Sequence, residues 1–252
     1  MESRRVLATL CAWCTLNGIE IDSRLRFNWD PNAGCGIFSR SYIPANTTLV
    51  RIPKHAVLST KSCTLASCIP TSLYGRGAQL ALSLAVYIEI LKGKFSRWSG
   101  YLQSVPRDIV DIPVFWNSGT GAGEMSCHRQ KDGTEALHWL RGTEVAKILT
   151  VGDDNKPVID EMRNYYHEVA QPLIFRHKSE ITRQLDIAPT LHDFYRAHAL
   201  VSSRAFVVDA YHGLCMVPVA DAFNHESPHN VHLEVRPAVT MNPSYFQSGG
   251  AE

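Results

Sequence analysis

An acid, an amide and an imidazole stand close together late in this chain, at Asp221, Asn224 and His225. They follow an apolar run, residues 215–220, whose length and valine and methionine content predict a buried strand. Polar side chains beside buried apolar surface need hydrogen-bond partners. An amide donates and accepts at once, so Asn224 is suited to recognising a heterocycle or a main-chain group. These residue types predict a binding site.

A metal centre is a rival interpretation of the same stretch. His225, His229 and His232 are close in sequence, and the first two have the i, i+4 spacing of a helical ligand pair. However, Pro228 breaks a helix between them, and the His-Glu-x-x-His pattern of metallohydrolases is absent. A metal-dependent hydrolase that uses this histidine cluster therefore stays an alternative, and we expect no metal.

Two other sets of residues are candidates for ligand binding. Gly34-Cys35-Gly36 would let the backbone approach a ligand closely, although a plain turn before a strand gives the same pattern. Arg204 could bind a carboxylate through its guanidinium, although an arginine at a helix end is also favoured by the helix dipole. Neither set identifies a function by itself.

In combination with other short motifs, these residues resemble the SET-domain protein lysine methyltransferases. The similar branch is the Rubisco large-subunit methyltransferase-like group, which includes ribosomal-protein lysine methyltransferases. Each motif is weak alone, and their common order over roughly residues 5–236 carries the resemblance. In chain order the motifs are residues 34–38, Leu49-Val50-Arg51-Ile52-Pro53, Ser96-Arg97-Trp98, Tyr101-Leu102, Val105-Pro106, Phe115-Trp116, Leu140-Arg141-Gly142-Thr143, residues 201–206 and Asn224-His225.

The resemblance implies S-adenosylmethionine as the cofactor and a lysine of a nonhistone protein as the substrate. It places Phe206 and Asp221 at the substrate channel, although Phe206 is more readily explained as a core residue. The residues that it places at the cofactor are Gly34, Cys35, Gly36, Arg204, Asn224 and His225.

The sequence departs from the family after the Asn–His pair. The family carries its catalytic tyrosine there in a Phe-x-x-Tyr-Gly context, whereas Tyr245 lies in Pro-Ser-Tyr-Phe-Gln. The catalytic residue is therefore unknown, and the chain looks truncated at its C-terminus. We expect little or no methyl transfer from it, and a non-catalytic SET-fold protein-binding module is the second hypothesis.

Composition narrows the class of protein. A net charge of +1 over 252 residues gives no electrostatic case for nucleic acid. Seven cysteines, an odd number without a zinc-like quartet, favour reduced thiols in the nucleus or cytoplasm. Residues 80–91 are too short to cross a membrane and include Glu89. We expect a soluble monomer that binds a protein substrate, and neither nucleic acid nor a membrane.

Hydrophobic periodicity and turn residues predict the elements that position the site. An amphipathic helix is expected over residues 1–18, in preference to a signal peptide, with Val6, Leu10, Trp13 and Cys14 on its buried face. The other expected elements are short strands within 34–60, a helix over 78–92, a loop over 117–135, a helical stretch over 156–183 bent at Pro172, a helix from the capping box at Thr190 to 203, and strands at 206–209, 214–219 and 231–235.

This order predicts an α+β fold, a SET-domain β core with a large helical insertion. The SET domain is expected over residues 1–236, with strand blocks at 34–60 and 204–235 and the insertion over about 75–203. Residues 237–252 form a divergent tail that is expected to be disordered. The two strand blocks should pack together in one core.

Overall fold

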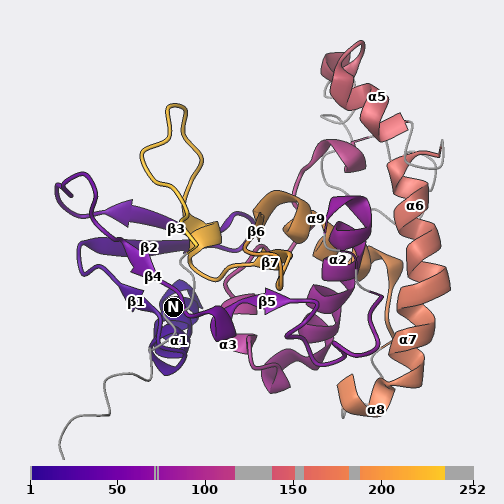
Figure 1. The fold of residues 1–252 in the computed structure, drawn as a ribbon, viewed down its shortest axis with the longest axis horizontal. Coiled ribbons are helices and arrows are strands. Elements are labelled where there is room, and N and C mark those ends of the chain that lie inside the picture. The colour runs from indigo at the N-terminus through magenta and orange to yellow at the C-terminus, as the bar shows by residue number, and fades with distance from the viewer. Residues whose placement is uncertain are drawn as a thin grey trace, which may run out of the picture.

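The computed structural model describes residues 2–70, 72, 74–116, 138–150, 156–181 and 188–235. Helices and small antiparallel sheets make up the fold, which confirms the predicted α+β class. The strands between residues 20 and 51 and α1 (Glu2–Leu16) lie on one side of the molecule, and the helices between residues 144 and 181 lie on the other (Figure 1). The loop expected over 117–135 and the tail expected over 237–252 lie outside the described residues, and the domain boundaries stay a prediction.

The N-terminal helix α1 forms as predicted. Its buried residues are Val6, Leu10, Trp13 and Cys14, the four expected on one face. The helix ends where Gly18 adopts a φ of 67° and the amide of Ile19 donates to the carbonyl of Cys14 at 2.9 Å. A left-handed residue after the last turn is the usual way to satisfy those final carbonyls, and glycine takes that conformation without steric cost.

An antiparallel hairpin of β2 (Leu25–Asp30) and β3 (Gly34–Ser39) follows, beside a short pair of β1 (Glu20–Ile21) and β4 (Val50–Arg51). The prediction covered β3 and β4 and missed β1 and β2. In β2 the buried residues Leu25 and Trp29 share one face, while the residues next to them are exposed. The hairpin therefore presents one face to the core and brings Gly34 to its tight turn.

A second sheet joins the two strand blocks. Its order is β5 (Leu58–Ser59), β7 (Leu214–Met216) and β6 (Ala205–Val207), and Leu58 pairs with Met216. Cys215 and Met216 are fully buried. This pairing confirms that strand segments on either side of the helical insertion share one core.

The strand expected at 231–235 is not formed. These residues follow a course without helix or strand, and Val231, Leu233 and Val235 are each at least 37% exposed. Their alternation of apolar and polar residues resembles a half-buried strand. A strand also needs a hydrogen-bonded neighbour, and within the part of the chain that the structure describes this segment pairs with none.

Helices α2 (Gly75–Lys92) and α9 (Leu191–Arg204) pack against each other at the centre of the molecule. The predicted helix over 78–92 corresponds to α2, and all its residues from Ala81 to Glu89 are buried. The Glu89 carboxylate is satisfied there by Thr64 and Ser96. In α9 the hydroxyl of Thr190 accepts from the amide of Asp193 at 3.1 Å, which confirms the predicted N-cap.

One of the remaining helical stretches continues through Pro172. α6 (Val158–Tyr165) widens into a π-helical segment, Tyr166–Ala170, immediately before α7 (Gln171–Arg176), in which Pro172 occupies the first turn. Proline lacks an amide donor, which agrees with the π-helical pattern just before it, but the backbone stays helical from Val158 to Arg176 and the bend at Pro172 stays a prediction. The other helical segments are α3 (Ser99–Leu102), α5 (Glu144–Thr150), α8 (Lys178–Ile181) and short turns at Lys54–Ala56, Gly93–Phe95, Pro113–Phe115 and Ala220–Ala222.

Among the described residues, no helix combines the length and the apolar character that a membrane span requires.

Candidate functional site

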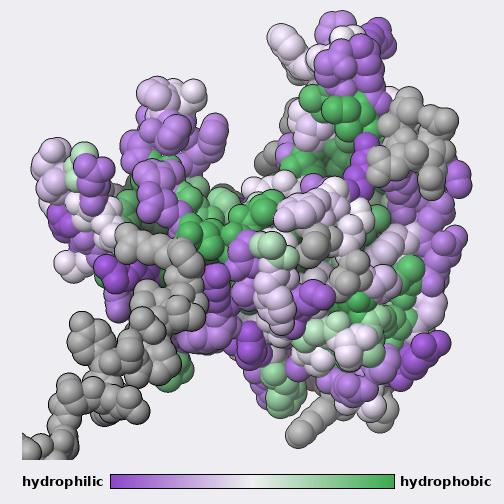
Figure 2. Space-filling model, in the orientation of Figure 1, coloured by the Kyte–Doolittle hydropathy of each residue, from purple (hydrophilic) through white to green (hydrophobic). Residues whose placement is uncertain are grey.

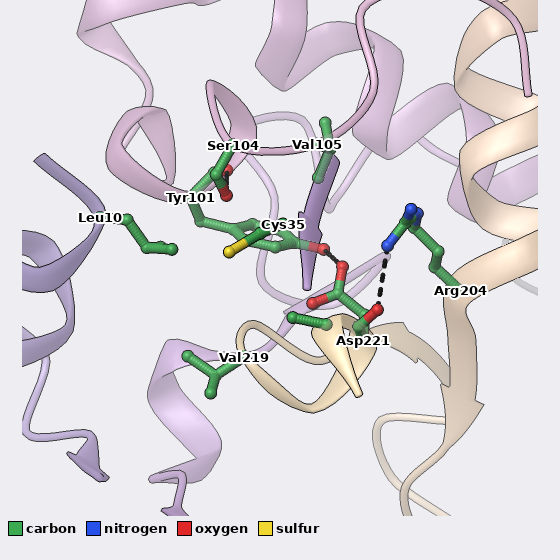
Figure 3. A pocket seen from close by; sticks show the side chains of 9 residues that line it. Leu10, Cys35, Tyr101, Ser104, Val105, Arg204, Val219 and Asp221 are labelled. Carbon is green, nitrogen blue, oxygen red and sulfur yellow. Dashed lines mark hydrogen bonds between the residues drawn. The ribbon is translucent and has the colours of Figure 1, made fainter. Parts of the chain in front are cut away.

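A small cavity lies beside the turn that follows β7 (Figure 3). Its walls come from α1, β3, α3, the end of α9 and the helical turn η5 (Ala220–Ala222). Its free volume of about 10 Å³ is room for roughly one water molecule, so it could take only a terminal group of a ligand. The lining residues are Leu10, Cys35, Tyr101, Ser104, Val105, Arg204, Val219, Asp221 and Ala222.

The Asp221 carboxyl is the acidic group of this cavity. The hydroxyl of Tyr101 donates to its Oδ2 at 2.6 Å. Burial raises the pKa of Asp221 from 3.8 to about 6, against the opposing effects of the Tyr101 hydrogen bond, the Arg204 charge and the backbone N–H groups of Asp221 and Val219. A carboxyl with such a pKa changes its charge close to neutral pH, which is common at functional sites.

Asp221 should leave a signature in the pH dependence of stability. Because its pKa is raised in the folded protein, its contribution is full below pH 3.8 and is lost as the pH rises through about 6. We therefore expect Asp221→Asn to gain stability relative to the native chain over that interval. Urea unfolding of both proteins at a series of pH values measures this difference. A difference that stays constant with pH would mean that Asp221 ionises normally in the folded protein.

Arg204, at the end of α9, bonds to two opposite parts of the chain at the cavity, Asp221 and Ala33. One terminal guanidinium nitrogen donates to the carbonyl of Asp221 at 2.9 Å, and the other donates to the carbonyl of Ala33 at 2.7 Å. Its Nε–H is buried and has no hydrogen-bond partner. A buried donor without a partner is unfavourable, so this N–H group is available to donate a hydrogen bond to an acceptor on a ligand. The arginine predicted to bind a carboxylate therefore does lie at the cavity.

The glycines of Gly34-Cys35-Gly36 have different environments. Gly34 has a φ of 82°, and a Cβ there would lie 2.7 Å from the Pro106 ring, so the chain itself requires glycine at this position. A Cβ on Gly36 would make an ordinary contact at 3.6 Å with Phe38. Cys35 lines the cavity, and burial raises the pKa of its thiol to about 12, so the thiol stays protonated at neutral pH.

Val219 gives the cavity a strained wall. It is 2% exposed and has a φ of 73° and a ψ of −44°. A β-branched residue in this region is a steric outlier, and such outliers cost on the order of 1–3 kcal/mol and concentrate at functional sites. The strain lies where the chain turns from β7 into η5, at the N–H group that faces the Asp221 carboxyl.

The other predicted site residues lie apart from the cavity lining. Asn224 and His225 are exposed, and their predicted contact with the cofactor stays a prediction. They begin an exposed segment, residues 224–235. This segment lies beside a hollow in the surface that has apolar residues at its base (Figure 2). Phe206 is half-buried and packs on a small cluster of Val57, Cys215 and Val217, in agreement with a core role.

The histidine cluster has no metal-like geometry. Across the described residues, which include His225, His229 and His232, no three His, Cys, Asp or Glu side chains come together in an arrangement that could hold a metal ion. His232 instead lies 2.9 Å from the Glu234 carboxylate. The hydrolase alternative thus gains no support from the structure.

Tyr101 and Val219 were not predicted as site residues. Tyr101 stood out only as part of a short motif, and 120 positions separate it from its partner Asp221. No periodicity or local spacing connects residues so far apart. The positive φ of Val219 also runs against the preference of its residue type, so the sequence could not have indicated it.

Comparison with known proteins supports the fold. No family model matches the chain. The N-lysine methyltransferase SETD6 of Rattus norvegicus is 25% identical over 240 residues, which cover 90% of this chain and 46% of that protein. Ribosomal lysine N-methyltransferase 3 of Saccharomyces cerevisiae is 25% identical over 230 residues, which cover 83% of this chain and 37% of that protein. The chain thus spans about half the length of these relatives, or less.

Solved structures show the same similarity. The SET domain of LSMT bound to lysine and AdoHcy superposes with a TM-score of 0.64 at 20% identity, over 89% of this chain and 44% of that one. Rubisco LSMT bound to AdoMet superposes with a TM-score of 0.55 at 18% identity, over 88% and 45%. The chain has a SET-domain fold, and the resemblance to the SET-domain lysine methyltransferases of this branch is confirmed.

Proposed function

We propose that this chain carries the S-adenosylmethionine-binding core of a protein-lysine N-methyltransferase that acts on a nonhistone protein. The SET fold and the named relatives support this proposal. The observation that carries it is the meeting of Arg204 and Asp221 at one cavity, with a buried guanidinium N–H left free. We further propose that the protein works as a monomer in the nucleus or cytoplasm. The free thiols of the described cysteines agree with a reducing compartment.

The charges that line the cavity suit the amino-acid end of this cofactor, of which a single terminal group fits inside. That end carries a carboxylate, which matches the free Nε–H of Arg204, and an ammonium, which matches the ionised Asp221 carboxylate. The cavity is too small for the nucleoside. The nucleoside would therefore lie outside it, over the surface where Asn224 and His225 are exposed. An amide and an imidazole offer donors and acceptors for a purine edge there.

When bound, S-adenosylmethionine supplies an activated methyl group on a sulfonium. This chain has to hold a neutral lysine amine in line with that group and to exclude water. Leu10, Val105 and Val219 give the cavity apolar walls for the second task. The catalytic residue stays unassigned, because Tyr245 lies outside the described residues.

Titration of the purified chain with S-adenosylmethionine by calorimetry tests this function. We expect binding by the native chain and binding about tenfold weaker in Asn224→Ala, because one hydrogen bond to the cofactor is lost. His229→Ala is the matched control. Both side chains are exposed, so neither substitution should disturb the fold, and a difference between them reports on ligand contact.

Two outcomes would contradict the proposal. Absence of binding by the folded native chain would reject the cofactor assignment. Equal affinities of the Asn224→Ala and His229→Ala variants would remove Asn224 from the site.

A further inference from the structure

The hydrogen bond between Tyr101 and Asp221 joins two distant parts of the chain at the cavity. The distance between the Tyr101 hydroxyl and Asp221 Oδ2 is 2.6 Å, and Tyr101 is only 1% exposed. Burial and then the Asp221 charge hold the pKa of Tyr101 well above its ordinary value. The tyrosine is therefore the donor, and the carboxyl is the acceptor.

The side of α3 that faces α1 is tightly packed. A Cβ on Gly100, the preceding residue in α3, would lie 2.4 Å from Cβ of Trp13 in α1. The rings of Trp13 and Tyr101 lie with their centroids 6.2 Å apart, and Trp13 Nε1 donates to the carbonyl of Arg97 at 2.6 Å. These contacts fix the Tyr101 hydroxyl in space, so the Asp221 side chain is oriented by a rigid donor rather than by solvent.

We infer that Tyr101 is the positioning residue of this site, which holds the Asp221 carboxylate toward a cationic group of the bound ligand. The inference rests on the proposed function and adds a residue that neither the sequence pattern nor the comparisons assign. Tyr101 acts through Asp221. The strained turn at Val219 orients the same carboxyl from the other side, because its N–H also faces it.

Among the residues that the structure describes, few charged or titratable groups face Asp221. Tyr101 approaches from α3, Arg204 from the end of α9, and the protonated Cys35 thiol from β3. Arg204 directs its terminal donors to backbone carbonyls. Within the described part of the chain, Tyr101 is thus the side chain that donates a hydrogen bond to this carboxyl, and that bond lowers the pKa of Asp221. Its loss should make the carboxylate harder to form at neutral pH.

The test compares Tyr101→Phe with the native chain by titrating S-adenosylmethionine from about pH 5 to about pH 9. For the native chain we expect affinity to rise with pH as Asp221 ionises. For Tyr101→Phe we expect that rise to occur at higher pH, with affinity about tenfold lower near pH 7 and recovered at the alkaline end. Asp221→Asn should bind weakly at every pH.

Tyr87→Phe is the matched control. Tyr87 is also fully buried, and its hydroxyl bonds the backbone of Thr190, away from the cavity. We expect its pH profile to coincide with that of the native chain. The positioning role would be overturned if the affinity of Tyr101→Phe rose over the same pH range as that of the native chain. It would also be overturned if the variant lost affinity equally at every pH.

Two further measurements keep the outcomes distinct. The first is the same titration with S-adenosylhomocysteine, which lacks the sulfonium charge. If Asp221 faces the sulfonium, the native chain and Tyr101→Phe should bind this ligand equally. If Asp221 faces the ammonium of the cofactor, Tyr101→Phe should still bind it more weakly near pH 7. If the native chain binds no cofactor, the proposed function fails, but the pKa of Asp221 can still be measured from the pH dependence of unfolding. A pKa that does not rise in Tyr101→Phe would then reject the inference on its own.

Discussion

Replacing Gly34 with alanine is expected to lower the free energy of unfolding by about 3 kcal/mol. Backbone strain and steric overlap both contribute to this loss of stability. A residue with a Cβ at a φ of 82° is unfavourable by roughly 1–2 kcal/mol, and forcing an atom into an occupied space costs about 1–3 kcal/mol. The added Cβ would lie 2.7 Å from the Pro106 ring and 3.1 Å from its backbone nitrogen, so a side-chain rotation cannot relieve the contact. Chemical denaturation measures the change.

Gly36→Ala is the matched control in the same strand. Gly36 has no positive φ, and a Cβ there would meet only the Phe38 ring at 3.6 Å. We expect its stability to stay within about 1 kcal/mol of the native value. Comparable losses in the two variants would mean that the turn at Gly34 is not tightly held against Pro106.

The part of the fold that depends on local pattern could be predicted from the sequence. The buried face of α1, the end of α2 at Gly93 and the cap at Thr190 each follow from the residue types at that place. The hairpin strand β2 was missed. Its six residues include Arg26, Asn28 and Asp30, which lower the apparent strand preference although they only occupy the exposed face.

The site was predictable only in part, because its geometry depends on contacts between distant segments. Arg204, Cys35 and Asp221 were named from residue type and resemblance, and the structure places all three in the cavity lining. Asn224 was placed at the cofactor together with them, from its residue type and the resemblance. The chain leaves the core at η5, however, and Asn224 emerges into solvent. Tyr101 reaches the site through the packing of α3 against α1, which no local sequence pattern encodes.

Replacement of Arg204 should have the largest effect on cofactor binding. In Arg204→Ala the carbonyls of Asp221 and Ala33 lose their donors, and the cavity loses its cation. A hydrogen bond from a charged group contributes about 1.5–3 kcal/mol, so we expect affinity for S-adenosylmethionine to fall on the order of a hundredfold. Arg204→Lys should recover little of it, because a lysine has no forked donors and no equivalent of the Nε–H.

Arg196→Ala separates binding from stability in this experiment. Arg196 lies in the same helix, and its guanidinium also donates to a carbonyl, that of Pro106, at 2.9 Å, but it does not line the cavity. It should therefore lose stability and keep its affinity for the cofactor within about twofold, since no ligand contact is removed. An affinity loss in Arg196→Ala as large as that in Arg204→Ala would assign the effect to stability. Undiminished binding by Arg204→Ala would instead remove this arginine from the site. The proposed role of Arg204 requires that both Arg204 variants lose affinity for the cofactor while Arg196→Ala keeps it. In that role the guanidinium bonds both cavity walls and still has a buried donor for the ligand.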